Sequence, residues 1–332
     1  MRRKPHVPES GIFLRSRRML ARDAVDAARL MSDELPVPAG LSGELAPLLH
    51  RLIAAELVSG ACVEGATTTQ RPPNGERKLF AFGLSAFIDE ACVGACIENP
   101  IANFALELLE RCRRGESRPG LLGVRDIAKA NAGSGLNLFP LMWVQRPKDK
   151  ASPLGAELTT QGMRTFLNHH RGYNLKRILK EGAREQEPTF TRAGFVRLKA
   201  FGGERDAPFG ERIVFEATRE QALAEAHGSA ISLLFLSARP QLGFTRIQQQ
   251  VLQCAVDDLC DVEIANHLNI SSHAVNMRWR TIYERIQQRP ELAASLFGPG
   301  ESRDGDGHAS QKRRRVTAFV RERPEELRPY AW

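Results

Sequence analysis

The chain has 332 residues, which is more than one compact domain usually needs, and 42% of them are apolar, which is ample for a buried core. Its formal net charge is +8, and this suggests a polyanionic partner without indicating a fold. No apolar run is long enough to span a bilayer, and the start MRRKPHVPESGIFLRSRRML carries charges where a signal peptide would need an uninterrupted apolar core. We therefore expect a cytoplasmic protein with two folded domains and reduced cysteines.

The first part of the chain alternates between helical and strand-like patterns. Apolar residues recur at three and four positions over 22–34, 43–58, 101–114, 124–131 and 156–181, which predicts helices. The apolar runs at 79–88, 136–144 and 194–201 are bounded by Gly, Pro or polar residues, as buried strands are. This alternation predicts an α/β or α+β domain over residues 1–235.

Two motifs in this region invite functional interpretations. Gly133-Ser134-Gly135 is similar to a phosphate-binding loop, and the order of strands and helices also suits the acetyl-CoA-binding fold of acyltransferases. However, phosphate loops open helices, whereas this Gly pair precedes an apolar strand, so we predict a turn. Cys92, Cys96 and Cys112 lack clustered histidines and are predicted to be buried thiols. The sequence thus predicts no catalytic residue, metal or cofactor.

The segment LCDVEIANHLNISSHAVNMRWRTIYERI, residues 259–286, contains two short amphipathic helical patterns separated by a small polar turn. Together with the pattern that begins at Phe244, they predict three helices that pack on one another. Ser271 is placed to cap the third helix, because its hydroxyl can accept a hydrogen bond from an amide of the first turn. This arrangement is a helix-turn-helix, whose second helix fits the DNA major groove.

The anchors of this pattern resemble the helix-turn-helix domain of LuxR-type transcriptional regulators over residues 244–297. They are Phe244-Thr245, Val251-Leu252, Glu263-Ile264-Ala265, Leu268, Ile270-Ser271, Val275 and Ile282. The resemblance implies a DNA-binding domain over 240–298. Gln248 stands where the family prefers Glu, which predicts a weaker polar contact between the first and third helices.

The resemblance also implies which residues meet DNA. The exposed face of helix 272–286 would read bases with Asn276, Met277 and Arg280, whose side chains suit adenine, the thymine methyl and guanine. Trp279 is predicted to be a core residue instead. The predicted phosphate contacts, which position the protein without specifying sequence, are Arg246, Ser272, His273, Arg278 and Arg285.

A fourth helix is predicted at 290–297, and the resemblance implies that it dimerises the protein through Leu292 and Leu296. Residues 299–332 begin with a stretch rich in Gly, Ser and charge, so we predict a flexible, disordered basic tail. The predicted fold class is thus an α/β or α+β sensor-like domain, an all-α helix-turn-helix domain and this tail.

These observations predict a DNA-binding transcriptional regulator and not an enzyme. It would be a homodimer on double-stranded DNA, controlled by a small-molecule effector at the sensor domain, with RNA polymerase as a further partner. Two alternatives stay open at this point. One is an acyltransferase-like enzyme with a DNA-binding appendage, and the other is a promoter-binding protein similar to sigma factors.

Overall fold

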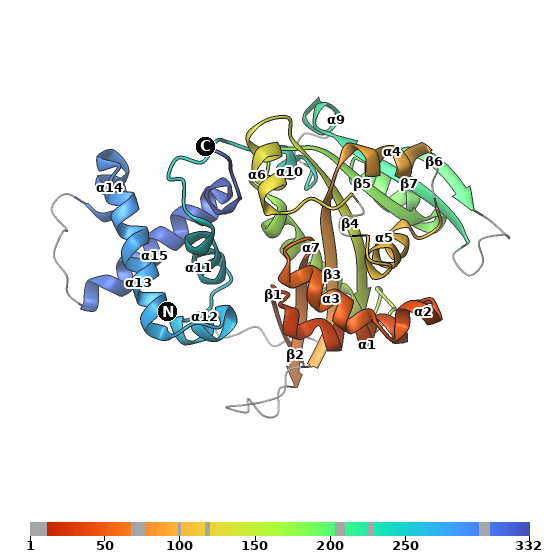
Figure 1. Cartoon of the computed structure of the whole chain (residues 1–332), viewed down its shortest axis with the longest axis horizontal. Coiled ribbons are helices and arrows are strands. Elements are labelled where there is room, and N and C mark those ends of the chain that lie inside the picture. Colours follow the sequence, from red (N-terminus) through yellow and green to blue (C-terminus); the bar gives the residue numbers. More distant parts are fainter. Residues whose placement is uncertain are drawn as a thin grey trace.

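The computed structural model describes residues 12–67, 78–98, 101–116, 120–202, 210–224, 229–298 and 306–332 (Figure 1). A mixed β-sheet with helices on both faces occupies one side of the molecule in this view, and a group of helices from the last third of the chain occupies the other. None of the described helices has both the length and the apolar character that crossing a membrane requires.

Within the described part of the chain the sheet has seven strands in the order β1-β2-β3-β4-β5-β7-β6. All neighbouring pairs are antiparallel except β4 and β5, which are parallel. The strands are β1 (Ile12–Arg18), β2 (Ser59–Thr67), β3 (Lys78–Ile88), β4 (Leu136–Gln145), β5 (Leu175–Ala183), β6 (Val196–Gly202) and β7 (Glu211–Thr218). The predicted strands at 79–88, 136–144 and 194–201 are confirmed as β3, β4 and β6.

Alternating residues of the central strands face two separate cores, because successive side chains of a strand point to opposite faces. Ile178 belongs to one core and Leu179 to the other, and both are fully buried. Helices of the first core are α1 (Ala24–Glu34), α2 (Ala39–Ser42), α3 (Leu45–Ala54), α4 (Glu90–Glu98) and α5 (Phe104–Arg113). Helices of the opposite face are α6 (Val124–Ala132), α7 (Pro153–His170), α8 (Glu187–Arg192), α9 (Arg219–Ala224) and α10 (Ser232–Phe235).

The predicted helix over 156–181 is wrong beyond His170, where α7 ends and the chain turns into β5. Gly172 has a φ of +83°, and a Cβ on it would lie 2.5 Å from the Pro324 carbonyl carbon, so the turn requires glycine. The predicted turn at Gly133-Ser134-Gly135 is confirmed, because α6 ends there and Gly135, with a φ of +90°, leads directly into β4.

The last third of the chain forms α11 (Arg246–Val256), α12 (Asp261–Leu268), α13 (Ser272–Gln287) and α14 (Pro290–Phe297), as predicted. Asn269 ends α12 with a φ of +52°, and the Ser271 hydroxyl caps α13 by accepting a bond from the Ala274 amide. Trp279 is buried in the common core, as predicted. Gln248 donates to Thr281 Oγ1 at 3.2 Å, so a polar contact does join α11 to α13.

The predicted disordered tail is wrong over residues 306–332, and residues 299–305 of that prediction lie outside the described residues. Residues 306–322 form α15 (Asp306–Glu322), which packs beside α11 and α14 (Figure 1). Val316, Phe319 and Val320 are buried in the same core as Trp279. Their three- and four-residue spacing is typical of one face of a helix. The neighbouring basic run KRRR and the Gly- and Ser-rich stretch before it favour a disordered tail instead, which is why the sequence alone predicts the wrong structure here. After α15 the chain forms the short helix η4 (Pro324–Leu327).

The final residues lie between the two groups of elements and join them. Arg328 is fully buried and donates to the Arg171 and Asn168 carbonyls at the end of α7, both at 2.8 Å. Glu326 accepts the backbone amides of Gln241 and Leu242. The sheet and the C-terminal helices therefore share a buried polar junction, and the predicted fold class of a sensor domain followed by a separate helical domain and a free tail is wrong.

Candidate active site

The residues predicted to contact bases lie on the outer side of α13. Asn276, Met277 and Arg280 are all exposed, and Met277 keeps 44% of its surface accessible. Arg280 forms an ion pair with Glu284 one turn later at 3.2 Å. Asn276 accepts a hydrogen bond from Arg313 of α15 at 3.0 Å, so part of this face is already engaged by the chain itself.

Two of the predicted phosphate contacts are engaged within the chain. Arg246 forms an ion pair with Glu56 at 2.6 Å, and Arg285 donates to the Gly243 carbonyl at 2.7 Å. Ser272 and His273 are exposed at the start of α13, and Arg278 is half-buried. Contacts with DNA by these residues stay predictions.

Leu292 and Leu296, predicted to dimerise the protein, are half-buried against the core of the C-terminal helices. Much of their apolar surface is therefore covered within the chain. The dimer, the effector and RNA polymerase also stay predictions.

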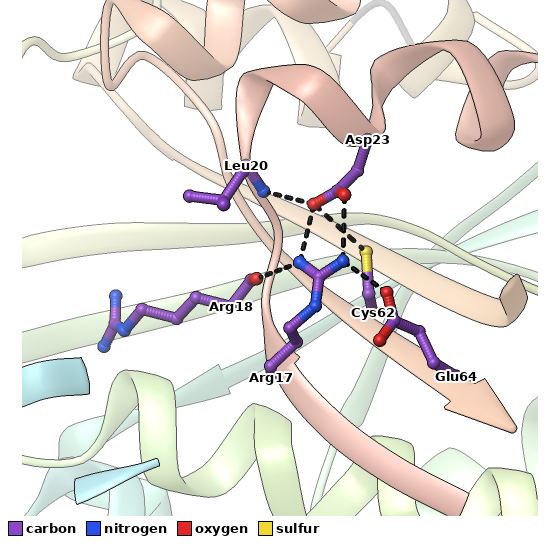
Figure 2. Close-up of polar contacts among 6 residues, drawn as sticks. All are labelled: Arg17, Arg18, Leu20, Asp23, Cys62 and Glu64. Atoms are coloured by element: carbon purple, nitrogen blue, oxygen red, sulfur yellow. Dashed lines mark hydrogen bonds and ion pairs between the residues drawn. The ribbon is translucent and has the colours of Figure 1, made fainter. Parts of the chain in front are cut away.

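A cluster of charged side chains joins β1 to β2 beneath the short helix η1 (Ala21–Asp23), and Figure 2 shows it. The guanidinium of Arg17 lies at its centre and bonds both carboxylate oxygens of Asp23, at 2.7 and 2.9 Å, as well as Glu64. The Leu20 amide donates to Asp23 at 2.6 Å, and the Cys62 thiol lies 3.9 Å from the same carboxylate.

The electrostatics of this cluster favour a structural role. Burial alone would raise the pKa of Asp23, but the hydrogen bond and charge of Arg17 outweigh it and lower that pKa. Burial and the charge of Asp23 raise the pKa of the Cys62 thiol, so it stays protonated and is a poor nucleophile. Because Arg17 bonds both carboxylates, the cluster fixes β1 to the sheet and offers little to a substrate.

The parallel strands β4 and β5 provide a different kind of site. They pair only at Leu136 with Leu175, Asn137 with Arg177 and Leu138 with Ile178, although both strands continue for five or more residues. On the other side of β4, the register against β3 shifts where Ser85 pairs with Pro140 and Leu84 with Met142. Pairing between β4 and β5 thus stops in the middle of the sheet. We call the stretch over which the two strands are not paired, beyond Leu138 and Ile178, the β4–β5 gap.

Lys180 of β5 reaches across the β4–β5 gap. Its Nζ donates to the Pro140 carbonyl of β4 at 3.0 Å and makes a longer contact of 3.5 Å with the Leu141 carbonyl. Burial lowers the pKa of this amine to about 8; Glu181 opposes that shift, whereas Arg212 and Lys150 add to it. A side-chain amine therefore takes the place of backbone pairing between these strands, and part of it is neutral at physiological pH.

The loop 146–152 follows β4 and leads into α7, and it carries Arg146, Lys148 and Lys150. Arg146 is paired with Asp33 and Glu34, and Lys148 with Glu34 at 3.3 Å. Lys148 and Lys150 are exposed, and the charge of Lys150 reaches the amine of Lys180. The loop therefore brings positive charge to the end of β4 next to the gap.

Helix α7 returns the chain from β4 to β5, lies over β1, β2 and β3, and contacts β4 through the ring of Trp143. Gly162 of α7 and Gly83 of β3 both lie against the ring of Trp143, and a Cβ on Gly162 would lie 2.6 Å from Trp143 Cζ2. The Trp143 Nε1 donates to Gln145 at 2.7 Å, and Thr159 of α7 donates to the same oxygen. These contacts fix the height of α7 over the strand that lines the gap.

Two cavities lie away from the gap. One, of about 510 Å³, lies between the end of α3 and the start of α6 and is lined by Leu57, Arg125 and Lys129 among others. The other, of about 240 Å³, lies beside Trp332 and Arg285. Neither cavity contains a residue of β4 or β5. The β4–β5 gap is the stronger candidate site because it combines unpaired backbone groups with a lysine amine whose pKa is lowered.

The sequence did not predict this site. Lys180 fell within the predicted helix 156–181, where it is one basic residue among several. The local pattern that accompanies the site is an apolar strand followed by the basic loop RPKDKAS and a capped helix. The cap is Ser152, whose hydroxyl accepts a hydrogen bond from the Gly155 amide.

No protein-family model and no curated protein sequence matches the chain. Solved structures do resemble it. One is described as a putative acetyltransferase of the GNAT family from Desulfovibrio desulfuricans, with 12% identity, 62% of this chain and 99% of that chain covered, and a TM-score of 0.33. NAA60 of Arabidopsis thaliana, solved with acetyl-CoA, has 9% identity over 63% and 99% of the two chains and a TM-score of 0.38. The spermidine/spermine N-acetyltransferase SpeG of Vibrio cholerae has 11% identity over 66% and 100%, with a TM-score of 0.35.

Our predictions of a sensor-like fold, a transcriptional regulator and a protein that is not an enzyme differ from the descriptions of these neighbours, two of which are named acetyltransferases and one of which was solved with acetyl-CoA. We expected a regulator because the helix-turn-helix motif was the most specific pattern in the sequence, whereas the pairing of strands leaves no local motif. At identities of 9 to 12% the activity of this chain has to be argued from its own residues.

Proposed function

We propose that the chain is an acyltransferase that takes an acyl group from a thioester of coenzyme A held in the β4–β5 gap. The observation that carries this proposal is the end of strand pairing after Leu138 and Ile178, where a single lysine amine replaces backbone partners.

Strands that separate inside a sheet leave backbone N–H and C=O groups that need partners. An extended ligand with its own amides can pair with such a strand as an added strand would. The pantetheine arm of coenzyme A is a linear chain with two amides, so it suits the free side of β4. Lys180 is bonded to two carbonyls there, and because it is a flexible side chain it can turn away when a ligand arrives.

The charge around the gap suits the phosphates of the same carrier. Lys148 and Lys150 lie at the end of β4 with their side chains exposed, and cations there attract phosphate groups. The carboxylates Asp33 and Glu34 pair with Arg146, and Glu34 also pairs with Lys148 at 3.3 Å. The Lys148 side chain is exposed, so a phosphate group can compete for this surface ion pair. Coenzyme A would supply the acyl group as a thioester, and the chain would bind it, orient it along β4 and exclude water from it.

The test is release of free thiol when acetyl-CoA or a longer acyl-CoA is mixed with the full chain and a panel of primary amines. Changing both Lys148 and Lys150 to Ala should raise KM for the acyl-CoA about tenfold and leave kcat within about twofold, because phosphate contacts contribute mainly to binding. Raising the salt concentration should raise KM in the wild type more than in this variant. Lys129→Ala, in the 510 Å³ cavity, is the matched control and should change neither constant. Thiol release no faster than in buffer, for every acyl-CoA and amine tested, would refute the proposal.

A further inference from the structure

We infer that Lys180 is itself an acyl acceptor: its amine takes the acyl group from a thioester in the β4–β5 gap, so that the chain acylates itself at this residue. The inference rests on the proposed function, because it requires the thioester to lie along β4. It goes beyond that function by assigning a modification site and a reaction to a residue on the opposite strand.

The geometry places one nucleophile in the gap. The Nζ of Lys180 lies within 3.0 Å of the Pro140 carbonyl, on the side of β4 that β5 has left unpaired. A ligand that pairs with β4 at this point must displace the amine from these carbonyls, which leaves it directly beside the ligand. Reacting groups held side by side in this way react as an intramolecular pair.

The charges that face this amine favour its neutral form. Its pKa is lowered to about 8, mainly by burial and to a smaller extent by the charges of Arg212 of β7 and Lys150 of the loop after β4, while the charge of Glu181 of β5 opposes the shift. Glu181 is itself bonded to Arg212 at 2.7 Å and accepts the backbone amides of Asn103 and Phe104, so its charge is largely compensated. A neutral lysine amine is the nucleophilic form.

The reaction is balanced without any further reagent. The nitrogen lone pair of neutral Lys180 attacks the thioester carbonyl carbon and forms a C–N bond, and the C–S bond breaks with its electron pair passing to sulfur. The nitrogen loses one proton and the thiolate gains one, so the products are an amide at Lys180 and free coenzyme A. No oxidation occurs. The modified side chain loses its charge and can no longer donate the charge-assisted bond to Pro140.

The test is peptide mass spectrometry of the full chain after incubation with acetyl-CoA, with Lys176 as the internal control. Lys176 lies on the same strand but is ion-paired with Glu90. We expect up to one acetyl group per chain at Lys180, at a rate that saturates with acetyl-CoA and exceeds that at Lys176 at least tenfold. Below pH 8 the rate should rise about tenfold per pH unit, because the neutral fraction does. Chain unfolded in urea should lose the selectivity, and Lys180→Arg should abolish the acetylation at this site.

Calorimetry with coenzyme A, which carries no acyl group, separates this inference from the proposed function. If coenzyme A binds saturably but Lys180 is acetylated no faster than Lys176, self-acylation is refuted and the donor site stands. If coenzyme A does not bind and Lys180 is not selectively acetylated, both proposals are refuted. Lys180→Arg that still binds coenzyme A shows that the loss of acetylation is not a loss of folding.

Discussion

Replacing Gly162 by Ala tests whether α7 rests on β4 through Trp143 as the structure shows. An interior helical glycine is about 0.5–1 kcal/mol less stable than alanine, so the substitution would stabilise an isolated helix. Here the new Cβ would lie 2.6 Å from Trp143 Cζ2, with the neighbouring Cη2 closer still, well inside van der Waals contact. The ring also borders Gly83 of β3, where an added Cβ would lie 3.0 Å from Cε3, so the ring must move to make room at Gly162.

The expected cost follows from what the ring loses. Overpacking costs about 1–3 kcal/mol, and losing the 2.7 Å bond from Trp143 to Gln145 costs about 1 kcal/mol. After subtracting the gain in helix propensity, Gly162→Ala should lower the free energy of unfolding by about 1–3.5 kcal/mol. Gly94→Ala is the matched control, since Gly94 lies within α4 and an added Cβ there meets nothing within 4 Å. It should raise stability by up to about 1 kcal/mol.

Urea denaturation of the two variants beside the wild type measures both effects, with the midpoint compared at an unchanged slope. The two substitutions should shift the midpoint in opposite directions. If both shift it upward by a similar amount, Trp143 does not pack against Gly162, and the position of α7 over β4 is wrong.

Three further results are expected. Leu327→Ala should lower the free energy of unfolding by about 2–4 kcal/mol in urea denaturation, because Leu327 is 3% exposed within the core of the C-terminal helices. Arg314→Ala, on the exposed surface of α15, is the control and should lower it by less than about 0.5 kcal/mol. Equally small effects of the two substitutions would mean that these residues form a flexible tail. Burial lowers the pKa of His170 to about 3, so the folded chain holds it neutral while the unfolded chain protonates it below about pH 6.5; stability should fall with acidification between these values. His170→Gln should remove about 1.4 kcal/mol of that loss per pH unit, and an unchanged pH profile of the unfolding free energy would count against a buried neutral histidine.

Much of the secondary structure follows from local patterns. The helices of the last third have apolar faces, caps and a polar turn at 269–272, and each of these features is encoded by residues close together in the sequence. The strand β4 is a long apolar run after glycines. Such elements depend on neighbours in the chain, so periodicity and capping residues were sufficient to predict them.

Other elements depend on partners far along the chain. The apolar residues of β5, Leu175, Ile178 and Leu179, are spaced three and four positions apart, as in a helix. However, the adjacent residues Ile178 and Leu179 face different cores, which requires a strand covered on both sides. Val316 and Val320 are buried only because α11 and α14 cover them. Charge composition cannot show such a partner, and this is why the tail was predicted to be disordered.

The candidate site depends on strand order, which no local pattern specifies. Lys180 is one of three basic residues within five positions, and only its neighbour across the sheet distinguishes it. That neighbour, the Pro140 carbonyl, lies forty residues earlier. The end of pairing between β4 and β5 likewise appears only when both strands are placed in one sheet.

The most direct test of the central claim is hydrogen exchange of the full chain with and without saturating coenzyme A, alongside a calorimetric titration. The account predicts saturable binding of one ligand per chain, with amide protection in residues 139–145 of β4 and in the loop 146–152. Lys148→Ala with Lys150→Ala should weaken the binding without moving the protected region. No saturable binding, or protection confined to residues 120–129 beside the 510 Å³ cavity, would contradict a donor site in the β4–β5 gap.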